Sequence, residues 1–440
     1  MRKTVVFAAL LLIAVSALAQ ESAQEIGADG AAACAPDNVA PNEEKIAAVA
    51  DGSIQEALAS WWGFNSDDAT ASLQAALNSG VRVLRIDKQN GPWNVTPLTI
   101  PSDIEVVLDS GVIVQAKQGA FQSPGASLFS IRNQKNVVFR GSGDSVLLMR
   151  KEDYQKEPYR KGEWRHGISL AAVKNVRIED LTVRSTGGDG IYIGAGKDGE
   201  PCENLTISRV ICDDNYRQGI SVISARNLLI EKCTLSNTRG TPPAAGIDFE
   251  PNSADECLVN CVMRDCVIEN NAGVGIELWL GQLKGGISEP ISLTFENCVS
   301  RNNDENGFFE AFRHHNNQVL QGEITLRNCL LAGNKQHAFR CHSKSPDAHA
   351  LTLENVTIDL TGVEKNFTAI RLACPADKEN VPPVRRPFGG MTLNNVVVID
   401  PEEREPILFT DDTGNGFELL DVTGTVSRHG SRHGAAGRLP

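Results

Sequence analysis

Residues 244–252 read Ala244-Ala-Gly-Ile-Asp-Phe-Glu-Pro-Asn252, and this short stretch decides the fold. Ile247 and Phe249 alternate with Asp248 and Glu250. Alternation with a period of two is typical of a β-strand that buries one face and exposes the other. The stretch therefore predicts a strand whose apolar side chains enter a core, while its two acids lie side by side on the solvent-exposed face.

The same glycine and apolar pattern recurs along the chain at intervals of 23 to 32 residues. Its copies begin at His166, Asp189, Gln218, Ala245, Val274, Asn306 and His337. A second set of apolar alternations lies between them, beginning at Asn175, Asn204, Asn227, Ile291, Glu323, Leu351 and Met391. Short strands at this spacing, without a helical period, predict an all-β solenoid of parallel strands whose coils stack about 4.8 Å apart. The predicted inward column consists of Ile168, Ile191, Ile220, Ile247, Ile276, Phe308 and Phe339.

A polar residue stands four positions before the Gly or Ala of several copies. These residues are Thr186, Asn215, Asn271, Asn303 and Asn334. An Asn that recurs at one turn is able to hydrogen-bond to its copy in the next coil. We therefore expect a ladder of side-chain hydrogen bonds at this corner of the solenoid.

Four of the eleven cysteines share one position in successive coils: Cys233, Cys266, Cys298 and Cys329. Val210 and Val356 occupy the same position in other coils, which indicates a small, buried, apolar site. We predict stacked free thiols there rather than disulfides, and no cysteine spacing resembles a zinc site. Two other pairings stay open, namely Cys257 with Cys261 and Cys202 with Cys212.

The region before the repeats contains a helical pattern at Asp67–Leu77, followed by apolar segments at 80–84, 93–95 and 98–108. This order, with the coils after it, resembles the right-handed parallel β-helix proteins of the pectin-lyase-like superfamily over about residues 65–425. The resemblance implies a short N-terminal helix that covers the open end of the solenoid, and an activity on polysaccharides. The chain departs from the polygalacturonase motifs, since Ser185-Thr-Gly-Gly-Asp189 is only a distant echo of one of them. A polygalacturonase is therefore not predicted, and Asp189 is a secondary candidate.

The two ends of the chain differ in composition from its middle. Residues 1–19 have a charged start, an apolar run and a small-residue end, which predicts a signal peptide and a secreted or periplasmic protein. We expect a flexible leader over 20–50, the β-helix domain with its cap over 51–426, and a disordered basic tail over 427–440. No other segment is long and apolar enough to predict a membrane span.

The formal net charge is −13, which argues against nucleic acid as a partner. It also bears on the substrate, because an acidic protein repels an acidic polymer unless a cation or a local basic patch intervenes. We expect a polysaccharide or oligosaccharide partner and a monomeric protein.

Alignment of the repeats gathers reactive side chains on one outer face. The candidates are the acids Asp248, Glu250 and Glu277, the aromatic residues Tyr192 and Trp279, and the bases Arg340 and His342. In the leading hypothesis, two of the acids hydrolyse a glycosidic bond without a cofactor, while Trp279 or Tyr192 stacks on a sugar ring. Asp248 and Glu277, one coil apart, would have carboxyl groups about 5 Å apart, near the retaining spacing, and the diagonal pair of Glu250 and Glu277 would be nearer the inverting spacing.

Two alternatives stay open for this face. In a Ca²⁺-dependent polysaccharide lyase, Asp248, Glu250 and Glu277 would hold the ion. Arg340 or Arg313 would act as the base, as the resemblance to similar lyases implies. In a non-catalytic glycan-binding or surface protein, the acids would only solubilise the sheet.

Glu310 breaks the alternation, because counting from Gly307 directs it into the core between Phe308 and Phe312. Either a bulge turns it outward, or it is a buried acid with a raised pKa. We expect the outward position, beside Glu277, with Arg313 and His314 close by as substrate-binding residues. The loops at 238–245 and 282–287 lengthen turns on either side of the acid strands and are expected to wall a cleft.

Overall fold

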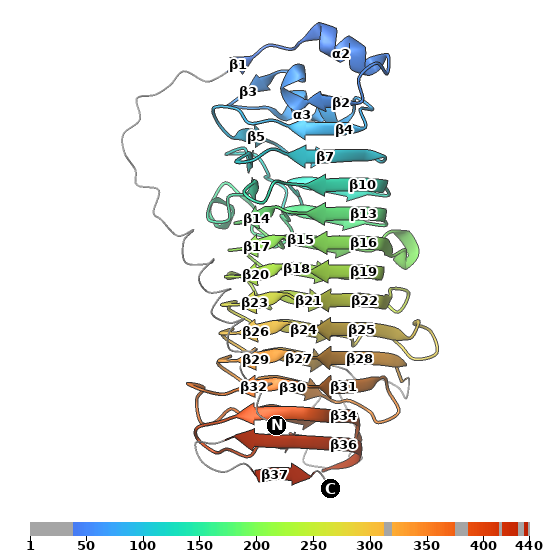
Figure 1. Ribbon diagram of the computed structural model, residues 1–440, viewed down its shortest axis with the longest axis vertical. Helices are drawn as coiled ribbons and strands as arrows, with labels where there is room; N and C mark the ends of the chain where they lie inside the picture. Colours follow the sequence, from blue (N-terminus) through green and yellow to red (C-terminus); the bar gives the residue numbers. More distant parts are fainter. Residues whose placement is uncertain (1–37, 312–318, 375–385, 413–415, 430–434, 439–440) are drawn as a thin grey trace, which may run out of the picture. The chain divides into compact units, whose positions relative to one another are not determined.

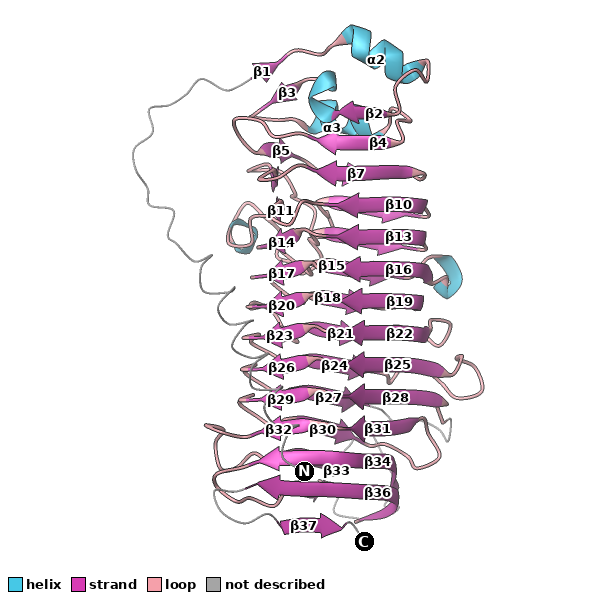
Figure 2. Cartoon of the chain, in the orientation of Figure 1, coloured by secondary structure: helices cyan, strands magenta, loops and turns pink. Residues whose placement is uncertain are grey.

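The computed structural model describes residues 38–311, 319–374, 386–412, 416–429 and 435–438. Within these residues the chain winds into coils that stack along one axis (Figures 1 and 2). A typical coil contributes three strands, such as β19 (Ala225–Glu231), β20 (Thr234–Ser236) and β21 (Ile247–Phe249). Each strand pairs in parallel with its copies in the neighbouring coils, which confirms the predicted solenoid.

The strands form three stacked series. The first series is β7 (Ile104–Leu108), β10 (Lys135–Arg140), β13 (Lys174–Glu179), β16 (Cys202–Ser208), β19, β22 (Leu258–Arg264), β25 (Ile291–Glu296), β28 (Gly322–Arg327) and β31 (Ala350–Glu354). The second is β8 (Ile113–Ala116), β11 (Val146–Leu148), β14 (Thr182–Arg184), β17 (Ile211–Asp213), β20, β23 (Val267–Glu269), β26 (Val299–Arg301), β29 (Leu330–Ala332) and β32 (Thr357–Asp359). The third, which carries the candidate site, is β6 (Leu98–Thr99), β9 (Phe129–Arg132), β12 (Ile168–Ala171), β15 (Ile191–Gly194), β18 (Ile220–Val222), β21, β24 (Ile276–Trp279), β27 (Phe308–Ala311), β30 (Phe339–His342), β33 (Ile370–Cys374) and β35 (Ile407–Asp411).

The core is a set of columns of apolar side chains that run along the stack. The predicted inward column from Ile168 to Phe339 is confirmed, since each of its members is at most 2% exposed. Phe308 and Phe339 stack with ring centroids 5.2 Å apart, and Phe295 packs edge-on against Phe308. The repeats therefore form the predicted core, because each coil buries its apolar residues only against the neighbouring coils.

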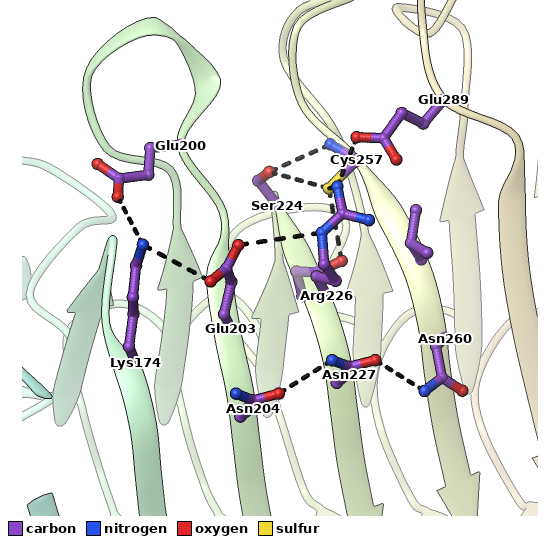
Figure 3. Close-up of polar contacts among 12 residues, drawn as sticks. Lys174, Glu200, Glu203, Asn204, Ser224, Arg226, Asn227, Cys257, Asn260 and Glu289 are labelled. Atoms are coloured by element: carbon purple, nitrogen blue, oxygen red, sulfur yellow. Dashed lines mark hydrogen bonds and ion pairs between the residues drawn. The ribbon is translucent and has the colours of Figure 1, made fainter. Parts of the chain in front are cut away.

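Asparagine ladders tie the coils together at two corners. The predicted buried ladder is present, with Asn271 Nδ2 donating to Asn303 Oδ1 and Asn303 Nδ2 donating to Asn334 Oδ1, both at 2.9 Å. A second, exposed ladder joins Asn204, Asn227 and Asn260 (Figure 3). The residues of the exposed ladder have φ between 52° and 56°, a left-handed backbone that Asn tolerates better than most side chains.

Charged side chains beside the exposed ladder also bridge the coils. Lys174 Nζ lies 3.5 Å from Glu200 and 3.6 Å from Glu203, and Arg226 reaches Glu203 at 4.0 Å and Glu289 from the other side (Figure 3). These pairs are partly exposed, so each contributes little to stability. They alternate in sign along the stack, which removes like-charge contacts between coils.

The cysteines of the column of Cys233 are buried and form no disulfides, as predicted. None of the ten cysteines in the described part of the chain is in a disulfide, including Cys202, Cys212, Cys257 and Cys261, whose pairing the sequence left open. Those in the column of Cys233 are each at most 4% exposed. The column thus contributes small apolar packing rather than cross-links.

The N-terminal end of the stack carries two helices, α2 (Glu43–Ala50) and α3 (Thr70–Leu77), and the short η1 (Ala59–Trp62). The helix expected at Asp67–Leu77 is present as α3, and Asp68 accepts a hydrogen bond from the Thr70 amide at its start. The expected flexible leader is shorter than predicted, because residues 43–50 are helical. Asn42 caps that helix by accepting from the Lys45 amide. The remaining elements here are β1 (Asn38–Val39), β2 (Glu56–Leu58), β3 (Phe64–Asn65), β4 (Val83–Ile86) and β5 (Trp93–Val95).

The C-terminal end is formed by β34 (Arg386–Ile399), β36 (Phe417–His429) and β37 (Ala435–Arg438). The prediction of a disordered tail over 427–440 is therefore wrong in part, since β36 extends to His429 and β37 pairs antiparallel with it. The last coil of a solenoid leaves a row of unpaired backbone groups, and an added strand pairs with them. The predicted signal peptide lies outside the described residues, and none of the helices described reaches the length and hydropathy that crossing a bilayer requires.

Candidate active site

The candidate acids lie in the middle of the eleven-stranded sheet, on β21 and β24. Asp248 pairs directly with Glu277, and the column continues to Phe309 and Arg340 in the next two coils. On the other side of Asp248 the column continues through Ser221, Tyr192 and Ser169. The register predicted from the repeats is thus confirmed, and it places the acids one coil apart.

The expectation of a solvent-exposed face is wrong for two of the acids. Asp248 is 1% exposed and Glu277 is 8% exposed, although both point away from the core. The loop at 238–245 packs against the turn before β24 so closely that a side chain on Gly273 would begin 1.7 Å from the Pro243 carbonyl oxygen. The outer face is therefore a second buried layer here, and two carboxyl groups are removed from water within it.

Gln218 connects this loop to the acids. Its Nε2 donates to Asp248 Oδ2 at 3.0 Å, while its Oε1 accepts from the Ala245 amide at 3.0 Å. Asp248 Oδ1 is buried and has no hydrogen-bond partner within the described residues. One oxygen of Asp248 is thus fixed and the other is left for a proton or a mobile partner.

Burial and the negative charges of neighbouring carboxylates favour the protonated form of both buried acids. Burial raises the pKa of Asp248 well above its usual range, and the charges of Glu277 and Glu250 raise it further. Burial raises the pKa of Glu277 to about 8, with added contributions from Glu305 and Glu250. A carboxylic acid that keeps its proton at neutral pH is suited to general acid catalysis.

Arg217, which the sequence analysis did not single out, balances the charge of this cluster. Its Nη2 lies 3.0 Å from Glu250 Oε2, and its other nitrogens lie 3.9 Å from Asp189 Oδ1 and from Glu163 Oε1. The Arg217 side chain is only 13% exposed, and the charges of Asp189 and Glu250 outweigh its burial and raise its pKa. The signal available in the sequence was its place directly before Gln218-Gly219, in the turn that leads to a repeat strand.

Asp189, the secondary candidate, lies at the edge of the same cluster. It is fully buried, and neither of its carboxyl oxygens has a hydrogen-bond partner within the described residues. Its backbone amide donates to His166 Nδ1 at 3.1 Å, and the His166 ring stacks on Tyr192 with centroids 4.7 Å apart. Burial, followed by the charge of Asp189, raises the pKa of Tyr192 to about 12, so its hydroxyl keeps its proton. One face of Tyr192 is thus occupied by His166 rather than open to a sugar ring.

A cavity of about 490 Å³ opens beside Glu277. Its walls are formed by the loop residues Arg239 to Ala244 on one side and by Glu305, Asn306, Phe309 and Arg340 on the other. The loop at 238–245 thus walls a cleft, as predicted. Trp279, the predicted stacking residue, is half-buried and packs against Ala245, Val274, Phe309 and Ala311.

Arg340 and His342 are held together on β30. Arg340 Nε donates to His342 Nε2 at 2.6 Å, and the guanidinium lies 5.1 Å from the Phe309 ring centroid. Burial, together with the charges of Arg340 and Arg371, lowers the pKa of His342 to about 3, so the imidazole is a neutral acceptor. His342 therefore orients Arg340, which alone of the two lines the cavity.

Glu310 contradicts the expectation that it points outward beside Glu277. Strand β27 runs without a bulge, so Glu310 pairs with Leu278 in the inward row and is fully buried. Cys341 Sγ donates to Glu310 Oε2 at 2.7 Å, and His349 Nε2 lies 3.1 Å from Glu310 Oε1. Burial would raise the pKa of Glu310, but the hydrogen bond and charge of His349 and the charge of Lys344 outweigh it and lower the pKa. Glu310 is a buried charged side chain with a structural role inside the coil, and it does not line the cavity.

The other predicted residues of this region, Arg313 and His314, lie outside the described residues. The structure thus brings together Asp248, Glu250 and Glu277 with Arg217 on one side and Arg340 on the other. It does not bring Glu310 to them.

Comparisons with known proteins agree with this architecture. The family model of the right-handed β-helix region matches residues 161–284, which include the acid strands. The tailspike protein of Dettilon has a TM-score of 0.59 at 13% identity, covering 84% of this chain and 68% of that one. This chain folds as a right-handed parallel β-helix.

Two further structures share the β-helix. A tailspike of the Acinetobacter baumannii bacteriophage Fri1, described as a capsular polysaccharide depolymerase, has a TM-score of 0.53 at 13% identity, covering 84% of this chain and 61% of its own. An exopolygalacturonase from Thermotoga maritima has a TM-score of 0.50 at 12% identity, and the match covers 90% of this chain and 98% of that one. At 12% and 13% identity, these similarities show a shared fold and nothing about activity.

Curated sequences match over a shorter region. The SPbeta prophage-derived protein YorA of Bacillus subtilis is 29% identical over 164 residues, and YclG of the same organism is 27% identical over 163 residues. Each match covers 35% of this chain and less than a third of the relative, 28% and 27%. Both relatives are described as uncharacterized, so their names add no activity to the β-helix protein.

Proposed function

We propose that this protein is an exported carbohydrate-active enzyme that hydrolyses a glycosidic bond in a polysaccharide. The observation that carries the proposal is Glu277, a carboxyl group with its pKa raised to about 8 that lines a cavity next to a second, charge-paired carboxylate. Two carboxyl groups held in different protonation states are the requirement for acid and base in glycoside hydrolysis. The depolymerase and exopolygalacturonase with the same fold support a polysaccharide as the substrate.

Glu277 is assigned as the general acid. It faces the cavity, keeps its proton at neutral pH and has one buried oxygen, Oε2, without a partner within the described residues. In the reaction it gives its proton to the oxygen of the leaving sugar as the glycosidic bond breaks. Asp248, buried beside it on the neighbouring coil and held by Gln218, is assigned as a positioning residue.

Glu250 is assigned as the base that takes a proton from the attacking water. The ion pair with Arg217 compensates its negative charge, and its side chain is 30% exposed, so water reaches it. Glu250 directly follows β21, two residues after Asp248, the register partner of Glu277, and this diagonal placement favours the wider carboxyl separation of an inverting mechanism. Glu305 also lines the cavity, and burial raises its pKa, so it is the alternative candidate for the base.

A lyase is the second candidate, and Arg340 favours it. Burial, followed by the charge of Arg371, lowers the pKa of Arg340, as a base in β-elimination requires. The predicted Ca²⁺ site at Asp248, Glu250 and Glu277 is not part of this candidate, because the part of the chain that the structure describes has no group of three or more His, Cys, Asp or Glu side chains placed to hold a metal ion. The two candidates differ in product, since elimination leaves an unsaturated sugar and hydrolysis consumes water.

The test is cleavage of a panel of polysaccharides by the full chain, with and without EDTA. Hydrolysis predicts new reducing ends without ultraviolet-absorbing unsaturated product, no effect of EDTA, and loss of activity in Glu277→Gln and Glu250→Gln. Glu296→Gln, on the outer face of a different strand series, is the matched control and should keep full activity. Unsaturated product, with or without EDTA, would establish the lyase instead. If wild type and Glu277→Gln bind glycans equally and neither cleaves them, the site is a binding surface. Export is tested separately, by the N-terminal sequence of protein recovered outside the cytoplasm.

A further inference from the structure

Two arginines lie next to each other on the wall of the candidate site. Arg340 on β30 pairs in register with Arg371 on β33, and both side chains are half-buried. Within the described residues, neither arginine has a carboxylate oxygen closer than 4.0 Å, whereas most arginines of the outer faces are paired in this way. Like charges on adjacent strands destabilise a sheet unless an anion lies near them, and the nearby carboxylates Glu305 and Asp412 compensate Arg340 only in part because neither forms an ion pair with it within the described residues.

The contacts of Arg340 hold it toward the cavity. Its Nε donates to His342 and its guanidinium packs on the Phe309 ring, and within the described residues its two terminal nitrogens have no hydrogen-bond partner. Arg371 lies one coil behind and donates through Nε to Thr410 Oγ1 at 3.2 Å. A planar guanidinium fixed in this manner is suited to bidentate recognition of a carboxylate or a sulfate.

A second, independent observation comes from Asn306, which lines the same cavity. Its side chain is fully buried, and neither Oδ1 nor Nδ2 has a hydrogen-bond partner within the described residues. A buried amide without partners costs about 1–3 kcal/mol, so such a group indicates a ligand or ordered water in the cavity. An amide that both donates and accepts matches a sugar hydroxyl.

We propose that this cavity is a subsite for an anionic sugar, whose carboxylate or sulfate binds Arg340 with Arg371 behind it and whose hydroxyl binds Asn306. The inference rests on the proposed function and names its substrate class. It also resolves an electrostatic difficulty, because a chain of net charge −13 repels an acidic polymer except where positive charge is concentrated locally. Glu277, two coils from Arg340 in the same column and also lining the cavity, would then face the bond beside the bound anionic residue.

The experiment is isothermal titration calorimetry with the full-length Glu277→Gln variant, so that turnover does not interfere. Three probes of equal length are compared: a 1,4-linked uronic acid tetramer, the same tetramer after carboxyl reduction, and a sulfated neutral tetramer. The expected result is that an anionic probe binds at least 10-fold tighter than the reduced one. The first or the third probe then identifies carboxylate or sulfate as the recognised group.

Variants show whether the arginines cause that preference. Arg340→Ala should abolish the 10-fold preference while leaving the affinity for the reduced tetramer within about twofold, since only a charge contact is removed. Asn306→Ala should weaken all probes alike. Arg301→Ala is the matched control, because Arg301 is ion-paired to Glu269 on another strand series and should leave every affinity unchanged. Arg371→Ala is a second route if Arg340→Ala unfolds, and should reduce the preference by severalfold.

The inference is overturned if no probe binds, if the reduced tetramer binds as tightly as the anionic ones, or if Arg340→Ala retains the preference. Its failure is distinguishable from failure of the proposed function. Cleavage of a neutral polysaccharide without anionic preference would retain the hydrolase and remove the subsite. Tight anionic binding by a wild-type protein that cleaves nothing would retain the subsite and remove the hydrolase.

Discussion

Arg217 Nη2 lies 3.0 Å from Glu250 Oε2, and this pair joins the acid strand β21 to the turn before β18. The pair is mostly buried, with side-chain exposures of 13% for Arg217 and 30% for Glu250. Asp189 and Glu163 approach the same guanidinium from other coils. A single cation thus holds carboxylates from three turns of the β-helix.

Removal of Arg217 should destabilise the protein because it leaves these carboxylates without compensation. We expect Arg217→Ala to lower the free energy of unfolding by about 3 kcal/mol, as for other broken buried pairs. Urea unfolding at pH 7 gives this value, and the double variant Arg217→Ala with Glu250→Gln should recover part of it. A single variant as stable as wild type, or a double variant that is simply the sum of the two, would show that the pair is uncoupled.

The activity of the enzyme should fall as the pH rises through about 8. Glu277 acts in its protonated form and has its pKa raised to about 8, so the active form is lost above that value. The measurement is kcat/KM against pH on whichever polysaccharide the panel identifies. An alkaline limb that stays flat to pH 9 would exclude Glu277 as the acid.

The same carboxyl group predicts an unusual pH dependence of stability. A raised native pKa means that the native state binds a proton which the unfolded chain has released, so the stabilisation is complete below about 4.5 and is lost as pH rises toward 8. Glu277→Gln cannot lose this proton. The variant should therefore gain stability relative to wild type as pH increases from 5 to 8, as seen in melting temperature. Glu296→Gln serves as control, and parallel curves for wild type and Glu277→Gln would contradict the prediction.

The strand register could be predicted from the sequence because each repeat has its Gly and apolar residues at the same positions. Each Gly-Ile pair fixes which residue faces inward, and this places Asp248 opposite Glu277 without knowledge of the structure. The columns of Ile168 and Cys233 follow from the same rule. Local alternation and a regular repeat are enough to predict which residues are neighbours in adjacent coils of a solenoid.

The burial of the acids could not be predicted in this way. It depends on how the loop at 238–245 packs against the turn before β24, and a loop of this length has no period. Arg217 was missed because its partners Asp189 and Glu250 lie in different coils, so no local pattern joins them. Glu310 was placed on the wrong face since its partner His349 comes from a segment 39 residues later. Contacts between residues far apart in the sequence decide where these side chains lie. For Glu310, the alternation rule alone predicted the buried position correctly, and the expectation that a bulge turns the acid outward was wrong.

The interior cluster around Glu310 should be important for folding but not for the reaction. Glu310→Gln removes the charge that compensates His349 and Lys344, so we expect a loss of about 3 kcal/mol in the free energy of unfolding. The lowered pKa of Glu310 means that its stabilisation is present above about 4.5 and is lost on acidification below that value. Wild type should therefore lose stability below pH 4.5 more steeply than Glu310→Gln. If Glu310→Gln is as stable as wild type but inactive, the residue belongs to the active site after all.

The two asparagine ladders allow a matched comparison of buried and exposed hydrogen bonds. Asn303 is fully buried, donates to Asn334 at 2.9 Å and accepts from Asn271 at 2.9 Å. Asn297, in the same coil, makes similar ladder bonds in an exposed position, donating to Asp265 at 2.9 Å and accepting from Asn328 at 3.3 Å.

Asn303→Ala leaves the Asn271 backbone amide buried without its acceptor and removes the side-chain bonds to Asn271 and Asn334, so it should cost about 2–3 kcal/mol of unfolding free energy. Asn297→Gly, which keeps the left-handed backbone at φ 54°, should cost less than about 1 kcal/mol because water replaces the lost bonds. Chemical denaturation of both variants at pH 7 measures the difference. Equal losses would mean that the buried ladder stabilises the β-helix no more than the exposed one, and that the apolar columns alone set its stability.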